Sequence, residues 1–225
     1  MYVPAHFEET RIEVLQDLIR AHPLATLVTM SSVGINANHI PLHLAQVTEQ
    51  YGTLQGHVAR ANPMWSDLNN EVEALVIFQG PNSYITPSWY PTKQEHGKVV
   101  PTWNYVVVHA YGALRVIDDP IWVKRQLELL TTQQEELFNK PWKISDAPAE
   151  FTDRMIGAIV GIEIVITKLT GKWKVSQNQP ELNKAGVVQG LQSLGSTETS
   201  ELASLVAETP KKILRTHKAE LSEKF

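Results

Sequence analysis

The chain has 225 residues, of which 43% are hydrophobic and 20% charged, and its formal net charge is −4 at pH 7. This balance can support a sizeable core, and the acidic total disfavours the broad attraction to phosphates that autonomous DNA-binding domains use. Cysteine is absent, which excludes disulfides, thiolate metal sites and a cysteine nucleophile. No apolar run approaches the ~20 residues of a membrane helix, and no signal peptide is visible. We therefore expect a soluble, cytoplasmic protein that does not contact a membrane.

The first predicted element is a helix over residues 10–21, which His22-Pro23 ends. Thr10 and Glu13 fit a capping box, in which the hydroxyl and the carboxylate each accept a hydrogen bond from a backbone amide that would otherwise lack a partner. Short strand-like runs follow at hairpin spacing: residues 24–30, 35–44, 53–60 and 73–80.

The segment from Gly80 to Gly112 is unusually rich in aromatic rings, prolines and polar groups. Long connections in compact domains are usually functional or disordered, and this one is too aromatic for disorder. We therefore predict that it forms a rigid wall of a binding site.

The second half alternates strand and helix signals. The pattern of residues 103–117 predicts one long strand or a bent strand pair with a bulge at Gly112. Asp119-Pro120 is a helix start because the carboxylate caps the first turn and proline fits it. The economical reading is a mainly β protein of antiparallel strands with flanking helices. The predicted layout is one domain over residues 1–191, with strands about 24–117, helices about 119–160 and a closing strand about 161–178, then a helical C-terminal tail over 192–225.

Five motifs, in order along the chain, resemble the PaiB family of FMN-binding negative transcriptional regulators: MYVPAHF, GHVARANPMW, GPNSYITPSWYP, GKVVPTWNYVVVHAYG and GKWKVSQNQP. The resemblance extends through about Leu191. It implies an antiparallel split β-barrel that forms a homodimer and, in relatives that bind flavin, holds FMN at the subunit interface. It also implies transcriptional regulation through the flavin, another small-molecule ligand or a protein partner.

FMN needs a cationic phosphate pocket, polar groups at the edge of its ring system and a flat apolar wall. Arg60 could bind the phosphate in a bidentate manner, helped by its neighbours His57 and Asn62, although a surface ion pair is the alternative. Lys98 and Lys174 are further phosphate candidates, and a solvated lysine is the alternative for each.

Two polar groups of residues could contact the ring system. Thr102, Trp103 and Asn104 offer a hydroxyl, an aromatic wall and a solvent-accessible amide, unless Trp103 plugs the barrel end and Asn104 caps a turn. Ser176 and Gln177 end the closing strand with polar groups, which could reach a ligand or form an ordinary exposed strand end.

Five histidines could converge on a metal or a haem: His39, His43, His57, His96 and His109. Their spacing matches no zinc pattern, so hydrogen-bonded histidines are preferred, we expect no metal site, and haem ranks below FMN as a cofactor.

Three functions remain open: a flavin-binding regulator, an FMN-dependent oxidoreductase acting on a small metabolite, and a direct DNA-binding repressor. The last has the least support, because no helix-turn-helix pattern is visible. The basic cluster from Lys211 to Lys218 is soon followed by Glu220 and Glu223.

Overall fold

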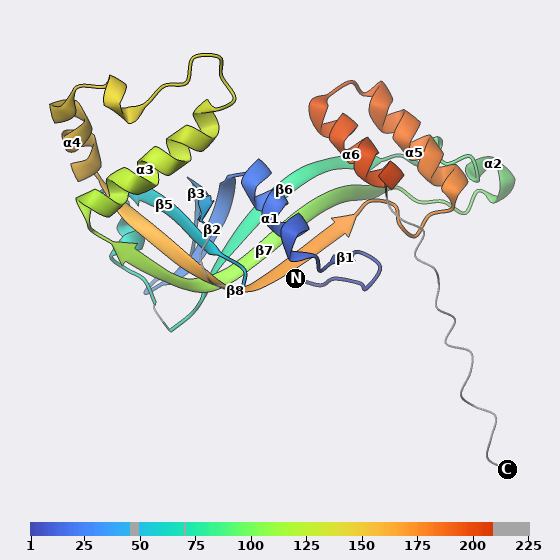
Figure 1. Cartoon of the computed structure of the whole chain (residues 1–225). Coiled ribbons are helices and arrows are strands. Elements are labelled where there is room, and N and C mark those ends of the chain that lie inside the picture. The colour runs from blue at the N-terminus through green and yellow to red at the C-terminus, as the bar shows by residue number, and fades with distance from the viewer. Residues whose placement is uncertain (46–49, 70, 209–225) are drawn as a thin grey trace, which may run out of the picture. The chain divides into compact units, whose positions relative to one another are not determined.

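The computed structural model describes residues 1–45, 50–69 and 71–208. In this part of the chain eight strands form a sheet in the order β3-β2-β6-β7-β8-β5-β4, with β1 beside β8 (Figure 1). The strands are β1 (Glu8–Glu9), β2 (Leu24–Ser31), β3 (Gly34–Pro41), β4 (His43–Ala45), β5 (Thr53–Ala59), β6 (Ala74–Ile85), β7 (Thr102–Ile117) and β8 (Ile159–Lys174). The pairs β1–β8, β2–β3, β2–β6, β4–β5 and β5–β8 are all antiparallel.

Helices flank this sheet, which confirms the predicted mainly β fold class. They are α1 (Ile12–Ala21), α2 (Lys93–His96), α3 (Pro120–Glu135), α4 (Ala149–Gly157), α5 (Glu181–Ser193) and α6 (Thr197–Glu208), with short 3-10 turns η1 (Pro63–Trp65), η2 (Pro87–Trp89) and η3 (Ile144–Asp146). Over the described ranges, no helix is both long and apolar enough to cross a membrane.

The chain forms two compact units. The first contains Met1–Pro81 and Tyr105–Trp173, and the second contains Asn82–Asn104 together with the chain from Lys174 onward. The predicted domain boundary at residue 191 falls inside α5. The basic cluster from Lys211 to Lys218 lies outside the described residues.

The core of the first unit follows from the alternation of side chains along β2 and β6. Ala25, Leu27, Val76 and Phe78 have no exposed surface and form one side of the sheet. Burying each of the three larger side chains, Leu27, Val76 and Phe78, stabilises the fold by about 1.5–3 kcal/mol. The residues between them lie on the opposite side of the sheet and are partly exposed.

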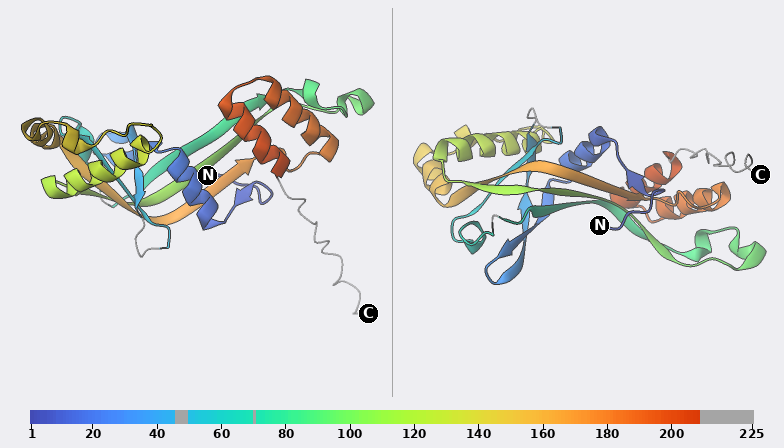
Figure 2. Two further views of the ribbon diagram at one scale, coloured as in Figure 1. Left: turned by 45° about the horizontal axis from the view of Figure 1, so that its top comes forward. Right: turned by 90° about the horizontal axis from the view of Figure 1, so that it is seen from below.

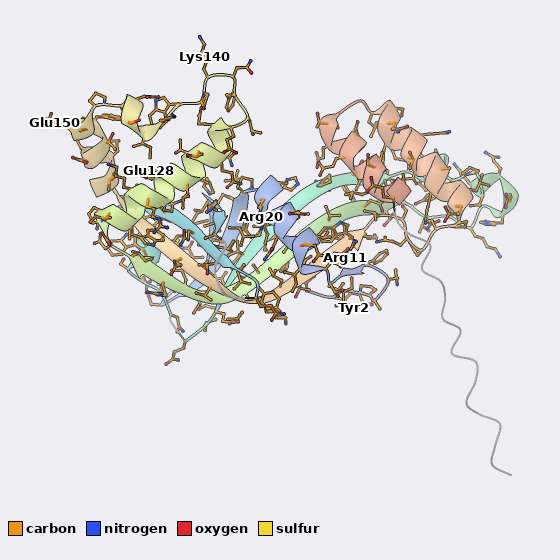
Figure 3. The ribbon with its side chains drawn as sticks, viewed as in Figure 1. Tyr2, Arg11, Arg20, Glu128, Lys140 and Glu150 are labelled. Atoms are coloured by element: carbon orange, nitrogen blue, oxygen red, sulfur yellow. The ribbon has the colours of Figure 1, made fainter. Side chains whose placement is uncertain are left out.

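The predicted capping box at the start of α1 is wrong. Arg11 is the residue that caps α1, and no side chain there bonds to the first turn. Instead, the Glu9 carboxylate accepts hydrogen bonds from the Arg11 backbone amide at 2.9 Å and from its guanidinium at 2.7 Å. Figure 3 shows Arg11 at one end of α1 and Arg20 near the other. The carboxylate that binds a backbone amide at the start of α1 is therefore that of Glu9, which precedes Arg11, and not that of Glu13, which follows it.

The start of α3 is as predicted, since Asp119 Oδ1 accepts a hydrogen bond from the Ile121 amide at 2.9 Å and Pro120 fills the first helical position. α3 packs against β5 and α4 in the first unit (Figure 1). Lys140 lies in the loop that follows it (Figure 3).

Strand boundaries differ from the prediction in two places that affect the candidate site. β6 runs on to Ile85 and β7 starts at Thr102, so the connection is shorter than the predicted wall and itself contains η2 and α2. β8 ends at Lys174, so Ser176 and Gln177 follow the strand instead of closing it. β6 is longer than local composition suggested because its backbone groups are paired with neighbouring strands, whereas β8 is shorter than predicted because the chain turns at Ser176.

In the second unit, α5 and α6 pack side by side, as both views of Figure 2 show. The η2 turn packs on α5 at two glycines. A Cβ on Gly186 would lie 1.9 Å from the Trp89 carbonyl oxygen, and one on Gly190 would lie 2.2 Å from its indole. Only glycine at these two positions allows this close approach. A buried hydrogen bond of 3.0 Å from the Thr92 hydroxyl to Asn183 Oδ1 adds to the contact.

Candidate ligand-binding site

Five of the predicted site residues gather where β7 begins and β8 ends, and we name them the β7–β8 cluster: Thr102, Asn104, Lys174, Ser176 and Gln177. All five belong to the second unit. Two hydrogen bonds join the two chain segments: the Lys174 ammonium donates to the Thr102 hydroxyl, and Asn104 Nδ2 donates to Ser176 Oγ at 2.8 Å. Residues 72 positions apart in sequence therefore form one polar group.

The Asn104–Ser176 pair is buried. Asn104 is 1% exposed and Ser176 is 3% exposed, so the prediction of a solvent-accessible amide at Asn104 is wrong. Ser176 also has a φ of +63°, a left-handed conformation that side-chain-bearing residues rarely adopt. Its carbonyl accepts a hydrogen bond from the Gln179 amide at 3.0 Å, and Gln177 Oε1 accepts one from the Val175 amide at 2.8 Å. This turn fixes the chain directly after Lys174.

Lys174 is the member of the cluster with spare hydrogen-bonding capacity. Its side chain is half-buried, and the ion pairs found among the described residues include none to Lys174. An ammonium group has three N–H donors, and Thr102 accepts one of them. Two donors and an uncompensated positive charge therefore remain for an anion.

Two aromatic side chains of the second unit, Tyr84 and Trp103, present flat apolar surface. Their rings meet edge to face with centroids 6.1 Å apart, and their exposed fractions are 47% and 54%. This exposure contradicts the alternative that Trp103 plugs the end of the barrel. Lys98 is exposed on the preceding loop, and its backbone amide donates to His96 Nδ1 at 3.0 Å.

The predicted residues His57 and Asn62 lie in the first unit and have partners within the chain. His57 Nδ1 is 2.9 Å from Gln126 Oε1 on α3. Asn62 caps η1 by accepting a hydrogen bond from the Met64 amide at 3.0 Å, and its Nδ2 donates to Asn38 at 2.9 Å. These contacts hold β5, α3 and η1 in place.

Arg60 has four hydrogen bonds within the first unit. Its guanidinium makes a bidentate pair with Asp118 at 3.0 and 2.6 Å, and it also donates to the carbonyls of Gly157 and Ile159 at 3.0 and 3.2 Å. The pair raises the pKa of Arg60 and lowers the pKa of Asp118, chiefly through the side-chain hydrogen bonds. A phosphate approaching this guanidinium would meet the Asp118 carboxylate, so the phosphate role of Arg60 stays a prediction.

The histidines occupy separate places. His39 lies on β3 and its ring is hydrogen-bonded to the Thr26 hydroxyl at 3.2 Å. His43 lies on β4, since Leu42 separates the two strands, and its ring is hydrogen-bonded to Gln133 at 2.8 Å. In the described ranges no three His, Asp or Glu side chains are grouped as metal ligands. His109 Nδ1 is buried and has no partner among these residues, and burial lowers the pKa of the ring.

Sequence reasoning missed two features of the second unit. Tyr84 lies in the segment predicted to form a wall, but it was not among the individual site residues, because the predicted strand ended at Gly80 and β6 runs on to Ile85. The glycines that receive Trp89 were also missed, and their signal was the four-residue spacing of Gly186 and Gly190 on one helix face.

Residues 1–168 match the family model described as "Putative FMN-binding domain". The chain belongs to this family. An uncharacterised protein of Emericella nidulans is 35% identical over 92% of this chain and 97% of its own length. The protease synthase and sporulation protein PAI 2 of Bacillus subtilis is 28% identical over 94% of this chain and 99% of its own length. These matches confirm the resemblance to the PaiB family.

Among solved structures, the FAD and heme binding protein of Mycobacterium smegmatis superposes with a TM-score of 0.53. It is 18% identical, and the match covers 74% of this chain and 73% of that one. At this identity the likeness concerns the fold, and it confirms the split-barrel class predicted for this family member.

Proposed function

We propose that the protein binds FMN at the β7–β8 cluster. The observation that carries this proposal is the half-buried Lys174 ammonium, which is bonded to Thr102 and has no carboxylate partner among the described residues. A phosphate oxygen can accept from both the ammonium and the hydroxyl, and charge-assisted hydrogen bonds of this kind are about twice as strong as neutral ones. Trp103 and Tyr84 supply aromatic surface of the kind that a flat ring system contacts.

Family membership supports FMN over other anionic ligands, because the matched family model is described as an FMN-binding domain. When bound, the flavin would supply an electron-accepting ring. The chain's own residues would bind it through its phosphate, with Lys174 and Thr102 as the donors.

We also propose a regulatory role that works through the bound flavin, another ligand or a protein partner. The similarity to PAI 2 of Bacillus subtilis, a sporulation protein by name, supports it. The net charge of −4 argues against direct contact with DNA. An FMN-dependent oxidoreductase is the alternative, and turnover of NADH or NADPH by the flavin-loaded protein would favour it.

A second subunit is part of this proposal. One side of the first unit's sheet, which we call the outer sheet face, carries two paired rows of partly or fully exposed residues: Ala37, Val28 and Leu75, and His39, Thr26 and Ile77. A mostly apolar sheet face of this kind usually marks an interface, and two-fold dimers are the commonest assembly. We therefore expect a homodimer that covers this face.

Light scattering tests the dimer. Wild type should have twice the mass of the chain at micromolar concentration, and Ile77→Asp should be monomeric because a charge in an apolar interface is not solvated. Val33→Asp is the control, since Val33 is 94% exposed in a turn. A monomeric wild type would contradict the expectation.

The absorption spectrum of freshly purified protein tests the cofactor. Bands near ~370 and ~450 nm are expected for flavin. A single intense band near ~410 nm would indicate haem instead, and His109, whose buried Nδ1 has no hydrogen-bond partner among the described residues, would then be the first residue to test as its ligand. A colourless protein that also fails to quench added FMN would contradict the proposal.

A further inference from the structure

A network of hydrogen bonds crosses the second unit from the start of β7 to the residue before α2. Asn104 Nδ2 donates to Ser176 Oγ at 2.8 Å, and the Ser176 carbonyl accepts from the Gln179 amide at 3.0 Å. Gln179 Oε1 accepts from Asn183 Nδ2 at 3.1 Å, and Asn183 Oδ1 accepts from the Thr92 hydroxyl at 3.0 Å. We call these five residues the Asn104–Thr92 network.

Four of the five residues are buried, and Gln179 is half-buried. A buried network of this kind is rigid, because each broken hydrogen bond would leave a desolvated polar group without a partner. The network joins four segments of the second unit: β7, the turn after β8, α5 and the start of α2. Its members therefore hold the turn after β8 in place from α5 and α2 as well as from β7.

Ser176 is the strained member of the network. In the described part of the chain it is the one residue other than glycine with a positive φ, at +63°. A side chain crowds the neighbouring carbonyl in this left-handed conformation, which persists where surrounding contacts hold it and is often found at ligand sites. Here the contacts that hold it are the bond of its Oγ to Asn104 and the bond of its carbonyl to Gln179.

The strained residue follows Lys174 by two positions. Lys174 bonds to Thr102 and Ser176 bonds to Asn104, so two hydrogen bonds, spaced two residues apart on each side, join the same two segments. The Asn104–Ser176 bond is buried and fixes where the chain leaves β8. Lys174 needs such a fixed frame, because a hydrogen bond from its ammonium weakens steeply when donor and acceptor lose their alignment.

We propose that the Asn104–Thr92 network positions the Lys174 ammonium for an anion, and that Thr92 and Asn183 are positioning residues that contact no ligand themselves. They act through the rest of the network on the turn that follows Lys174. The inference rests on the proposed function, in which Lys174 binds the FMN phosphate. Removal of a hydrogen bond at Thr92 therefore weakens binding at Lys174.

Quenching of FMN fluorescence by the full chain measures this effect. Thr92→Val keeps the shape of the side chain and removes its hydroxyl, and we expect FMN affinity to fall roughly two- to tenfold, the range for changes within a coupled network. Thr92→Ser keeps the hydroxyl and should bind FMN as wild type does. Ser193→Ala is the control, because it removes a hydroxyl of α5 that lies outside the network and bonds to the Gly190 carbonyl at 2.6 Å.

The melting temperature separates positioning from a purely structural role. Thr92→Val should melt lower than wild type, and affinities are therefore compared well below both melting temperatures, where each protein is folded. A Thr92→Val protein that melts lower but binds FMN as tightly as wild type would overturn the proposal.

Two variants of Ser176 test the strained conformation itself. Ser176→Gly and Ser176→Ala both remove the Oγ atom, so any contact of that atom with a ligand is lost equally. Glycine adopts a positive φ readily and alanine does not. We therefore expect Ser176→Gly to bind FMN more tightly than Ser176→Ala, and equal affinities would overturn the role of the left-handed turn.

Chemical labelling of the protein without FMN tests the position of Lys174 independently of the cofactor. Acetylation by an N-hydroxysuccinimide ester, followed by mass spectrometry, should be severalfold faster at Lys174 in Thr92→Val than in wild type, because the ammonium is released from Thr102. The exposed Lys168 should react equally in both. Equal rates at Lys174 would overturn the proposal. If wild type does not bind FMN, the proposed function fails, and the labelling rates alone decide whether the network positions Lys174.

Discussion

Lys174 and Arg60 were both predicted to bind a phosphate, and the structure gives them different surroundings. Arg60 in the first unit holds Asp118 and two backbone carbonyls. Lys174 in the second unit holds one hydroxyl. A cation whose charge is already matched by a carboxylate gains little from an anion, and a cation bonded to a neutral group gains more. The partners of a cation therefore indicate its role better than its residue type does.

The largest expected effect is on FMN affinity at Lys174. Lys174→Ala should weaken FMN binding by about 1.5–3 kcal/mol, roughly 10- to 150-fold, because it removes a charge-assisted hydrogen bond to the phosphate. Fluorescence quenching of FMN measures this directly.

The comparison is made with two variants of the first unit. The control is Lys168→Ala, which should bind FMN normally. Lys168 is an exposed lysine on β8, the strand that ends at Lys174, and its ammonium lies 5.4 Å from the centre of the Tyr111 ring. If the phosphate is at Lys174, as proposed, Arg60→Ala should also bind FMN normally. A loss of affinity at Arg60 with none at Lys174 would return the phosphate to the first unit.

A smaller effect, on stability, is expected at Asn104. Asn104→Ala removes the donor to Ser176 in a buried site, and an unmet buried acceptor costs about 1–3 kcal/mol in the free energy of unfolding. Urea denaturation measures the loss, with Asn178→Ala as the exposed control. Unchanged stability combined with lost FMN affinity would instead make Asn104 a ligand-contacting amide.

The sequence predicted the elements of the fold well where local signals and pairing agree. The Asp119-Pro120 start of α3 and the strand at β2 were found because capping chemistry and side-chain alternation act within a few residues. The helix α1 was predicted, but it begins at Ile12 instead of residue 10, and its cap was wrong because two carboxylates flank the start and the sequence alone cannot decide between them.

The candidate site was only partly predictable. The motif-bearing residues Thr102, Asn104, Lys174 and Ser176 were identified, and the structure brings them together. Which of them is buried depends on the pairing of segments 72 residues apart, and no local pattern encodes that pairing. The ion pair of Arg60 with Asp118 likewise joins residues 58 positions apart in the sequence, so no local pattern predicts it.

The smallest expected effect concerns the Arg60–Asp118 pair, which is exposed and therefore screened by solvent. Arg60 holds the pKa of the folded-state Asp118 carboxyl below its ordinary value of 3.8. The stabilisation is therefore fully present above that value, and it is lost as the pH falls through the lowered pKa.

Asp118→Asn should thus be slightly less stable than wild type at pH 7, and the difference should shrink below pH 3.8. Asp153→Asn, an exposed carboxylate of α4, should show no such trend. A stability difference that stays constant to lower pH would contradict the assigned cause. The same variant frees the guanidinium of Arg60, so an accompanying rise in FMN affinity would show that Asp118 had been competing with phosphate there, whereas unchanged affinity keeps the phosphate at Lys174.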